Sequence, residues 1–112
     1  MNNSLLGFPS GQNTAEPVTG LGYGQTWQNV VGSRALGTTY YNTTGRPIYI
    51  AGYATNAGGL SLRVDIGALA VSTTDSGSLN FVVFSTIVPP GASYAVVIGA
   101  GTGTLTAWRE LR

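Results

Sequence analysis

The segment LSLRVDI, residues 60–66, has the most regular alternation of apolar and polar side chains in the chain. Leucine, valine and isoleucine occupy every second position, with Ser61, Arg63 and Asp65 between them. Successive side chains of a β-strand point to opposite faces of its sheet. The segment is therefore typical of a half-exposed strand in an antiparallel sheet, with its aliphatic side chains facing the core.

Similar segments on both sides of residues 60–66 predict further strands. Apolar or β-branched runs alternate with segments rich in glycine and proline, which is the pattern of a β-sandwich or barrel. We expect turns at residues 56–59, 75–77, 89–91 and 99–104, and no helix. The predicted fold is all-β, a small antiparallel and jelly-roll-like β-sandwich over residues 25–112, with strands at 26–31, 38–42, 48–55, 60–66, 79–88, 93–98 and 105–111 and a short one around Val71.

Residues 1–24 differ in composition from the predicted sandwich. They mix Gly, Pro, Asn, Ser and Thr with isolated apolar residues and show no periodic pattern. Such a segment forms loop or extended chain rather than a regular element. We therefore expect an extended N-terminal arm over residues 1–24, ordered by contact with a neighbouring molecule.

The predicted strand over residues 79–88 is apolar on both sides. Its two faces are Leu79, Phe81, Val83 and Ile87 on one side and Val82, Phe84 and Val88 on the other. Either one face packs in the core and the other meets a partner, or a loop covers the second face of a central strand. The sequence leaves both interpretations open. The candidate residues of a subunit interface are Val82, Phe84, Val97 and Trp108.

The low content of charged residues bears on the partners of this protein. Only 8% of the residues are charged, against about 25% in an average soluble domain, and the formal net charge is +1. All five basic residues are arginines. This composition offers no clustered basic face for nucleic acid or for an anionic membrane, and no membrane insertion is expected. Since charges normally keep protein surfaces apart, we expect this surface to meet other protein and the chain to form a homo-oligomer.

The residues needed for most catalytic chemistry are missing or scattered. The chain has no His and no Cys, which removes the usual general bases, thiol nucleophiles and transition-metal ligands. The spacing of Glu16, Asp65, Asp75 and Glu110 indicates no pair of carboxylates, so surface charges that partly pair with arginines are expected. The glycines of residues 99–104 resemble a phosphate-binding loop, but no lysine or helix follows them. We expect a connecting loop there, no cofactor, and no enzymatic activity.

Aromatic side chains are the remaining candidates for binding. Tyr49 and Tyr53 are four residues apart, so they share one face of a strand, opposite the face that carries Ile48 and Ile50. Tyrosine buries a large area and keeps a polar group, which suits carbohydrate or protein contacts. Tyr49, Tyr53 and Arg63 are therefore candidate glycan or partner contacts. Alternatively, the rings pack against a neighbouring subunit or the arm.

Several sequence blocks resemble a small C-terminal β-domain of bacteriophage tail fibre and tail spike proteins. The resemblance runs from about Gly24 to the end of the chain, although residues 51–86 match only in their rhythm of strands and turns. The matching blocks are GQTWQ at 24–28, SRALGTTY at 33–40, NTTGRPI at 42–48, IVPPGASY at 87–94 and WRELR at 108–112.

The resemblance implies a β-sandwich that assembles as a homotrimer at the outer end of a fibre, on the outside of the virion, and contacts bacterial surface polysaccharide. The arm, through Leu5, Leu6 and Phe8, would then attach the domain to other virion proteins. Members of that family end long chains, whereas only the arm precedes the domain in this sequence. A capsid decoration protein, or a collar or baseplate attachment protein without a receptor site, is therefore the alternative. A carbohydrate-active enzyme is the third hypothesis, and the missing catalytic residues disfavour it.

Overall fold

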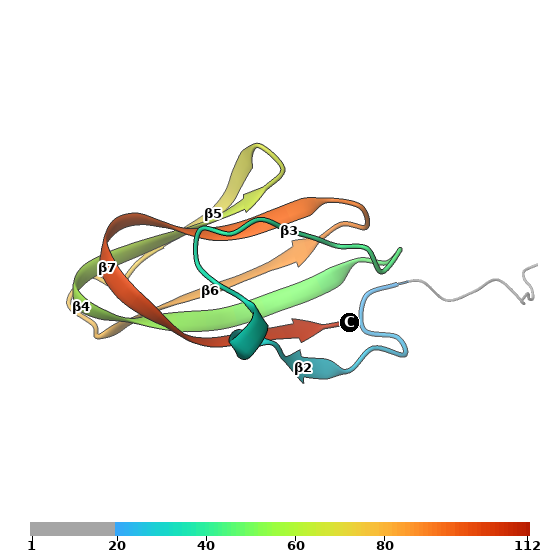
Figure 1. The fold of residues 1–112 in the computed structure, drawn as a ribbon, viewed down its shortest axis with the longest axis horizontal. Helices are drawn as coiled ribbons and strands as arrows, with labels where there is room; N and C mark the ends of the chain where they lie inside the picture. Colours follow the sequence, from blue (N-terminus) through green and yellow to red (C-terminus); the bar gives the residue numbers. More distant parts are fainter. Residues whose placement is uncertain (1–19) are drawn as a thin grey trace, which may run out of the picture.

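Two strands of 19 residues, β4 and β7, organise the fold, which a computed structural model describes for residues 20–112 (Figure 1). The described chain is all-β, and its six strands form one antiparallel sheet that is nearly closed into a barrel. No helix in this part of the chain is long and apolar enough to cross a membrane. The elements are β2 (Trp27–Asn29), a short 3-10 helix (Val31–Ser33), β3 (Tyr40–Tyr41), β4 (Ile48–Ile66), β5 (Leu69–Asp75), β6 (Phe81–Val88) and β7 (Ser93–Leu111).

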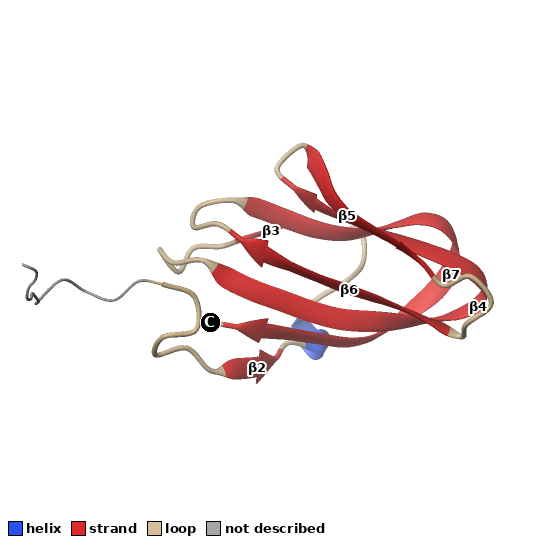
Figure 2. Ribbon diagram, turned by 180° about the vertical axis from the view of Figure 1, so that it is seen from behind, coloured by secondary structure: helices blue, strands red, loops and turns tan. Residues whose placement is uncertain are grey.

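Strands β4 and β7 pair with each other along most of their length and divide the sheet into two halves. In the first half, residues 48–55 of β4 pair with β6, residues 49–56 pair with the end of β7, and β7 in turn pairs with β2. In the second half, residues 61–66 of β4 pair with β5 and with the start of β7, which also pairs with β3. Seen from behind, the two long strands pass from one half to the other without interruption (Figure 2).

The predicted turns at residues 56–59 and 99–104 are wrong, because both segments lie inside continuous strands. The two strands bend together there, and their pairing register shifts on both sides of Gly58. Glycine makes this close crossing possible. A Cβ atom on Gly101 would lie 1.7 Å from the carbonyl oxygen of Gly59, and one on Gly103 would lie 2.4 Å from a methyl group of Leu60. Glycine in a strand commonly marks such a bend rather than the end of the strand.

The core lies between the two halves of the bent sheet. The alternation in residues 60–66 is confirmed, since Leu60, Leu62 and Val64 are buried and Arg63 is exposed. The other large buried side chains come from both long strands and from β6. They are Ile48, Ile50, Val82, Phe84, Val88, Tyr94, Val96 and Trp108.

Strand β6 shows which face of a two-sided apolar strand is inside. Phe84 is 2% exposed and packs against Trp108, with ring centroids 5.1 Å apart, and Val82 is also buried. On the opposite face, Phe81 and Val83 are 45% and 52% exposed. The prediction that Val82, Phe84 and Trp108 form a subunit interface is therefore wrong, because these side chains fill the core of a single chain. The sequence analysis assigned the partner contact to the face of this strand that turns inward, whereas the face with Phe81 and Val83 is the exposed one.

The two ends of the described chain lie together beside the first half. Thr26 and Arg112 exchange two backbone hydrogen bonds of 3.2 and 3.1 Å. The Arg46 guanidinium donates hydrogen bonds to the carbonyl oxygens of Gly20 and Tyr23, which fixes the turn that precedes β2. The predicted attachment residues Leu5, Leu6 and Phe8 lie outside the described residues.

Candidate functional site

The outer face of the first half gathers residues from four strands into cross-strand rows. Tyr53 on β4 lies opposite Val83 on β6 and Ala107 on β7. Two residues earlier, Ala51 lies opposite Ser85 and Arg109. A further row along the same face joins Ile87, Tyr49, Leu111 and Trp27, from β6 to β2.

Two edge-on aromatic pairs stand on this outer face. Trp27 meets Tyr49 with ring centroids 5.9 Å apart and planes at 85°. Tyr53 meets Phe81 at 6.3 Å and 71°. Since Tyr49 and Tyr53 are four residues apart on one strand, the two pairs are separated by roughly 13 Å.

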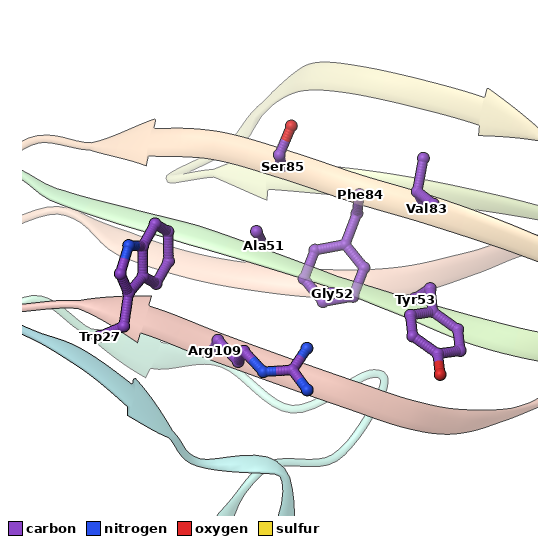
Figure 3. Close-up of a pocket in the computed structure, with 8 residues that line it drawn as sticks. All are labelled: Trp27, Ala51, Gly52, Tyr53, Val83, Phe84, Ser85 and Arg109. Carbon is purple, nitrogen blue, oxygen red and sulfur yellow. The ribbon is translucent and has the colours of Figure 1, made fainter.

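A shallow groove of about 550 Å³ lies between the two aromatic pairs (Figure 3). Trp27 stands at one end and Tyr53 at the other, and the side chain of Arg109 extends along the sheet toward Tyr53. The floor is made of small residues, and we call this site the aromatic groove. It is lined by Trp27, Ala51, Gly52, Tyr53, Val83, Phe84, Ser85 and Arg109.

The floor of the aromatic groove depends on the absence of a side chain at Gly52. A Cβ atom there would lie 2.1 Å from the carbonyl oxygen of Ala107 and 2.6 Å from the ring of Phe84. The Phe84 ring therefore reaches up beside Gly52 from the core and supports the groove from below. A bound molecule would meet a firm floor, because the core packing holds Phe84 in place.

A second groove continues the first on the other side of Tyr53. It has a volume of about 380 Å³ and is lined by Tyr53, Thr55, Asn80, Phe81 and Val83. Tyr53 and Val83 line both grooves, so the two form one track along β4 and β6. Such a track suits an extended ligand better than a small molecule, which needs enclosure on most sides.

Arg109 differs from the other four arginines in its hydrogen bonding. Arg34 and Arg112 pair with Glu110, Arg63 pairs with Asp65, and Arg46 donates to backbone carbonyls. Within residues 20–112, the guanidinium of Arg109 donates no hydrogen bond and forms no ion pair. As far as residues 20–112 are concerned, its five N–H donors are therefore open to a ligand on the outer face.

Glu110 is the centre of a buried polar cluster on the inner side of the same strand. Its carboxylate is fully buried and accepts hydrogen bonds from Arg34 at 3.1 and 3.2 Å, Tyr94 at 2.9 Å, Trp108 at 3.1 Å and Arg112 at 2.6 Å. Arg34 also lies over the ring of Tyr40, 4.6 Å from its centroid. The cluster ties both halves of the sheet to the segment between β2 and β3, and its role is structural.

The environment of Glu110 keeps its carboxyl group ionised. Burial alone would raise its pKa, but the hydrogen bonds from Arg34 and Tyr94 and the positive charges of Arg34 and Arg112 outweigh burial, so its pKa lies below the ordinary value of 4.5. Burial and the Glu110 carboxylate raise the pKa of Tyr94. The prediction of Glu110 as a surface charge is wrong, although its pairing with arginine is as expected.

The other described carboxylates are engaged away from the grooves. Asp65 binds Arg63 through two hydrogen bonds of 2.8 and 3.0 Å, and Asp75 accepts a hydrogen bond from the backbone of Gly77. No carboxylate lines the aromatic groove or its continuation. Among residues 20–112, no three His, Cys, Asp or Glu side chains are grouped so that they could hold a metal ion.

The predicted glycan contacts fall on two different surfaces. Tyr49 and Tyr53 do share the outer face of the first half, as their spacing indicates. Arg63 lies on the second half, past the bend of β4, where it pairs with Asp65. The half-buried Val97 lies opposite Arg63 on that same half and away from the aromatic groove.

The sequence prediction named neither Trp27 nor Arg109 as a contact of this surface. The alternation of β7 carried a signal for Arg109, since Trp108 and Glu110 face the core and Arg109 lies between them. Trp27 could not be placed in this way. Its strand is three residues long and exposed throughout, so only its pairing with β7 shows where the indole lies.

Comparison with known proteins adds no relative to this description. No protein-family model matches the chain. No curated protein and no solved structure shows a significant match either. The resemblance to the tail fibre domain therefore stays a prediction from the sequence.

Proposed function

We propose that this protein is a structural component of a bacteriophage virion. In this proposal it is a trimeric tail fibre module, with a jelly-roll-like domain that contributes to attachment on bacterial surface polysaccharide, and it has no catalytic role. The observation that carries the proposal is the aromatic groove, which is an exposed groove with a firm floor on a domain with very few charges. The sequence blocks that resemble tail fibre domains add support.

The exposed row on β6 supports assembly with further copies of the chain. Phe81, Val83 and Ile87 point outward and are about half exposed, and within the described chain β6 forms a strand ladder only with β4. Its link to β5 is a hydrogen bond from the Thr74 hydroxyl to the carbonyl oxygen of Val83. An apolar row on an edge strand is a surface that proteins usually cover or protect. Phe81 and Val83 line the two grooves, so in our proposal Ile87 at the other end of this row, in place of Val82, Phe84 and Trp108, contributes to the contact between subunits. The arm attaches the trimer to other virion proteins.

The absence of a catalytic role is supported by how the described acids are used. Glu110 is held by five hydrogen bonds in the core, and Asp65 is held by Arg63. Glycoside hydrolysis needs two carboxyl groups that converge on one bond. Incubation of the protein with host polysaccharide should therefore release no new reducing ends.

Two measurements test the proposal. Light scattering of the purified chain should give about three times the 11.5 kDa mass of one chain, and the mass of a single chain would contradict the trimer. Electron cryomicroscopy of the virion should place the protein at the tail. Density on the capsid lattice would instead support the decoration protein and contradict the fibre assignment.

A further inference from the structure

We propose that the aromatic groove binds an acidic polysaccharide, with Arg109 taking a sugar carboxylate while Trp27 and Tyr53 stack against neighbouring sugar rings. This inference rests on the proposed role in polysaccharide attachment and adds the chemical class of the ligand. Besides Tyr53, which the sequence already indicated, it assigns the contact to Arg109 and Trp27, which the sequence did not single out.

The positive charge in the groove indicates an anionic ligand. Arg109 lies between two aromatic side chains, on a floor of Ala51 and Ser85, and no carboxylate lines the groove. Planar guanidinium groups bind carboxylates through two parallel hydrogen bonds. Since Arg109 has no partner among residues 20–112, a ligand carboxylate would gain these bonds without displacing an ion pair of the described chain.

The aromatic side chains indicate that the ligand is a sugar chain. Indole and phenol rings present flat apolar faces and keep polar edges, which suits the apolar faces and hydroxyl groups of pyranose rings. Trp27 and Tyr53 stand at opposite ends of the groove, and the track continues past Tyr53 to Asn80 and Phe81. Asn80 is exposed there and adds a polar side chain for sugar hydroxyl groups.

Arg63 provides a matched control on the same chain. Both arginines lie on the outer surface of the sheet, and both are exposed. Arg63 differs because it forms a bidentate ion pair with Asp65 and has no aromatic groove beside it. A general effect of positive charge would therefore respond equally to both arginines, whereas a site at the groove would respond only to Arg109.

The test is a binding measurement with four acidic polymers and their neutral counterparts. The intact protein is titrated calorimetrically with hyaluronan, alginate, polygalacturonate and polysialate, each also in a carboxyl-reduced form. We expect at least one acidic polymer to bind more tightly than its reduced form. Arg109→Gln should weaken that binding roughly ten- to hundredfold, as expected for loss of a charged hydrogen bond. Arg63→Gln should leave it unchanged.

Trp27→Ala separates stacking from charge. It should weaken binding of the acidic polymer and of its reduced form by similar factors, because ring stacking does not depend on the carboxylate. Thermal unfolding and light scattering of each variant should match the unmodified chain. A change of oligomeric mass in Trp27→Ala would show that the groove is a subunit contact and would overturn the inference.

The remaining outcomes separate this inference from the proposed function. If the protein binds bacterial surface polysaccharide but shows no preference for carboxylates, or if Arg109→Gln and Arg63→Gln behave alike, the acidic-ligand inference fails and the attachment role stands. If neither the polymers nor whole host cells bind the intact protein, the attachment role fails as well.

Discussion

The two halves of the bent sheet share one core but have different outer surfaces. The first half exposes Phe81, Val83 and Ile87 beside two aromatic pairs and an arginine without a partner among the described residues. On the second half, the outer face of β4 carries Ser61 and the Arg63–Asp65 ion pair. Both halves bury the same kind of aliphatic residues inside. The second half also exposes apolar side chains, at Leu69, Val71 and Ile98. The two outer surfaces therefore differ in the aromatic groove and in the pairing of their arginines rather than in exposed apolar area.

Truncating one phenylalanine on each face of β6 should give the largest difference in stability between the core and the outer surface. Phe84→Ala should lower the free energy of unfolding by about 4 kcal/mol, because it opens a cavity against Trp108 in the core. Phe81→Ala should cost less than about 1 kcal/mol, since its ring is already 45% exposed. Urea unfolding monitored by tryptophan fluorescence measures both. Similar losses would mean that the outer row stabilises the single chain.

The carboxylates of the two halves should differ almost as strongly. Glu110→Gln removes the charge that balances Arg34 and Arg112 in the buried cluster, and should cost about 3 kcal/mol. Asp65→Asn breaks a partly exposed ion pair near the surface and should cost much less. Chemical unfolding of the two variants, side by side at neutral pH, measures the difference. A small effect at Glu110 would show that the cluster does not tie the halves together.

The glycine bend that joins the halves can be tested with two glycines of equal φ. Gly101 and Gly91 both have φ of +79°, but a Cβ atom would strike the backbone of Gly59 only at Gly101, and Gly91 faces open space. Gly91→Ala should cost about 1 kcal/mol through backbone strain alone. Gly101→Ala should cost about 2 kcal/mol more, because the crossing strands must move apart. Thermal unfolding of the pair checks this. Equal melting temperatures for the two variants would show that the close crossing at Gly101 does not require glycine.

The smallest expected effect is the pH dependence of the buried cluster. The pKa of Glu110 is lower in the folded chain than its ordinary value of 4.5, so the unfolded chain takes up the proton first as the pH falls. Its contribution is complete above about pH 4.5 and is lost as the pH falls through the lowered pKa, by about 1.4 kcal/mol for each unit of pKa difference. Urea unfolding between neutral and acid pH should show this loss, and it should be smaller in Glu110→Gln than in the unmodified chain. If the free energy of unfolding fell equally with pH in Glu110→Gln and in the unmodified chain, the acid sensitivity would belong to other carboxylates.

The sequence patterns predicted the local structure well where alternation was strict. Residues 60–66 alternate as expected, and Ile48 and Ile50 face inward while Tyr49 and Tyr53 face outward. The turns at residues 56–59 and 99–104 were wrong because glycine-rich segments look alike in a hairpin and in a bend between two paired strands. Of the candidate site, Tyr53 and the neighbouring Tyr49 were found in advance, whereas Trp27 and Arg109 were not.

The sequence by itself determined the all-β class, the inward face of β4 and the low charge of the surface. These properties depend on residue type and on a period of two, which are local. Only the tertiary structure decided which face of β6 is buried, since both faces carry large apolar residues and pairing with β4 selects one of them. The tertiary structure also decided that Glu110 is buried among arginines and that Arg109, the residue just before it, faces the aromatic groove. The role of a charged side chain depends on the residues that other strands place around it, and these contacts between distant segments form only in the folded sheet.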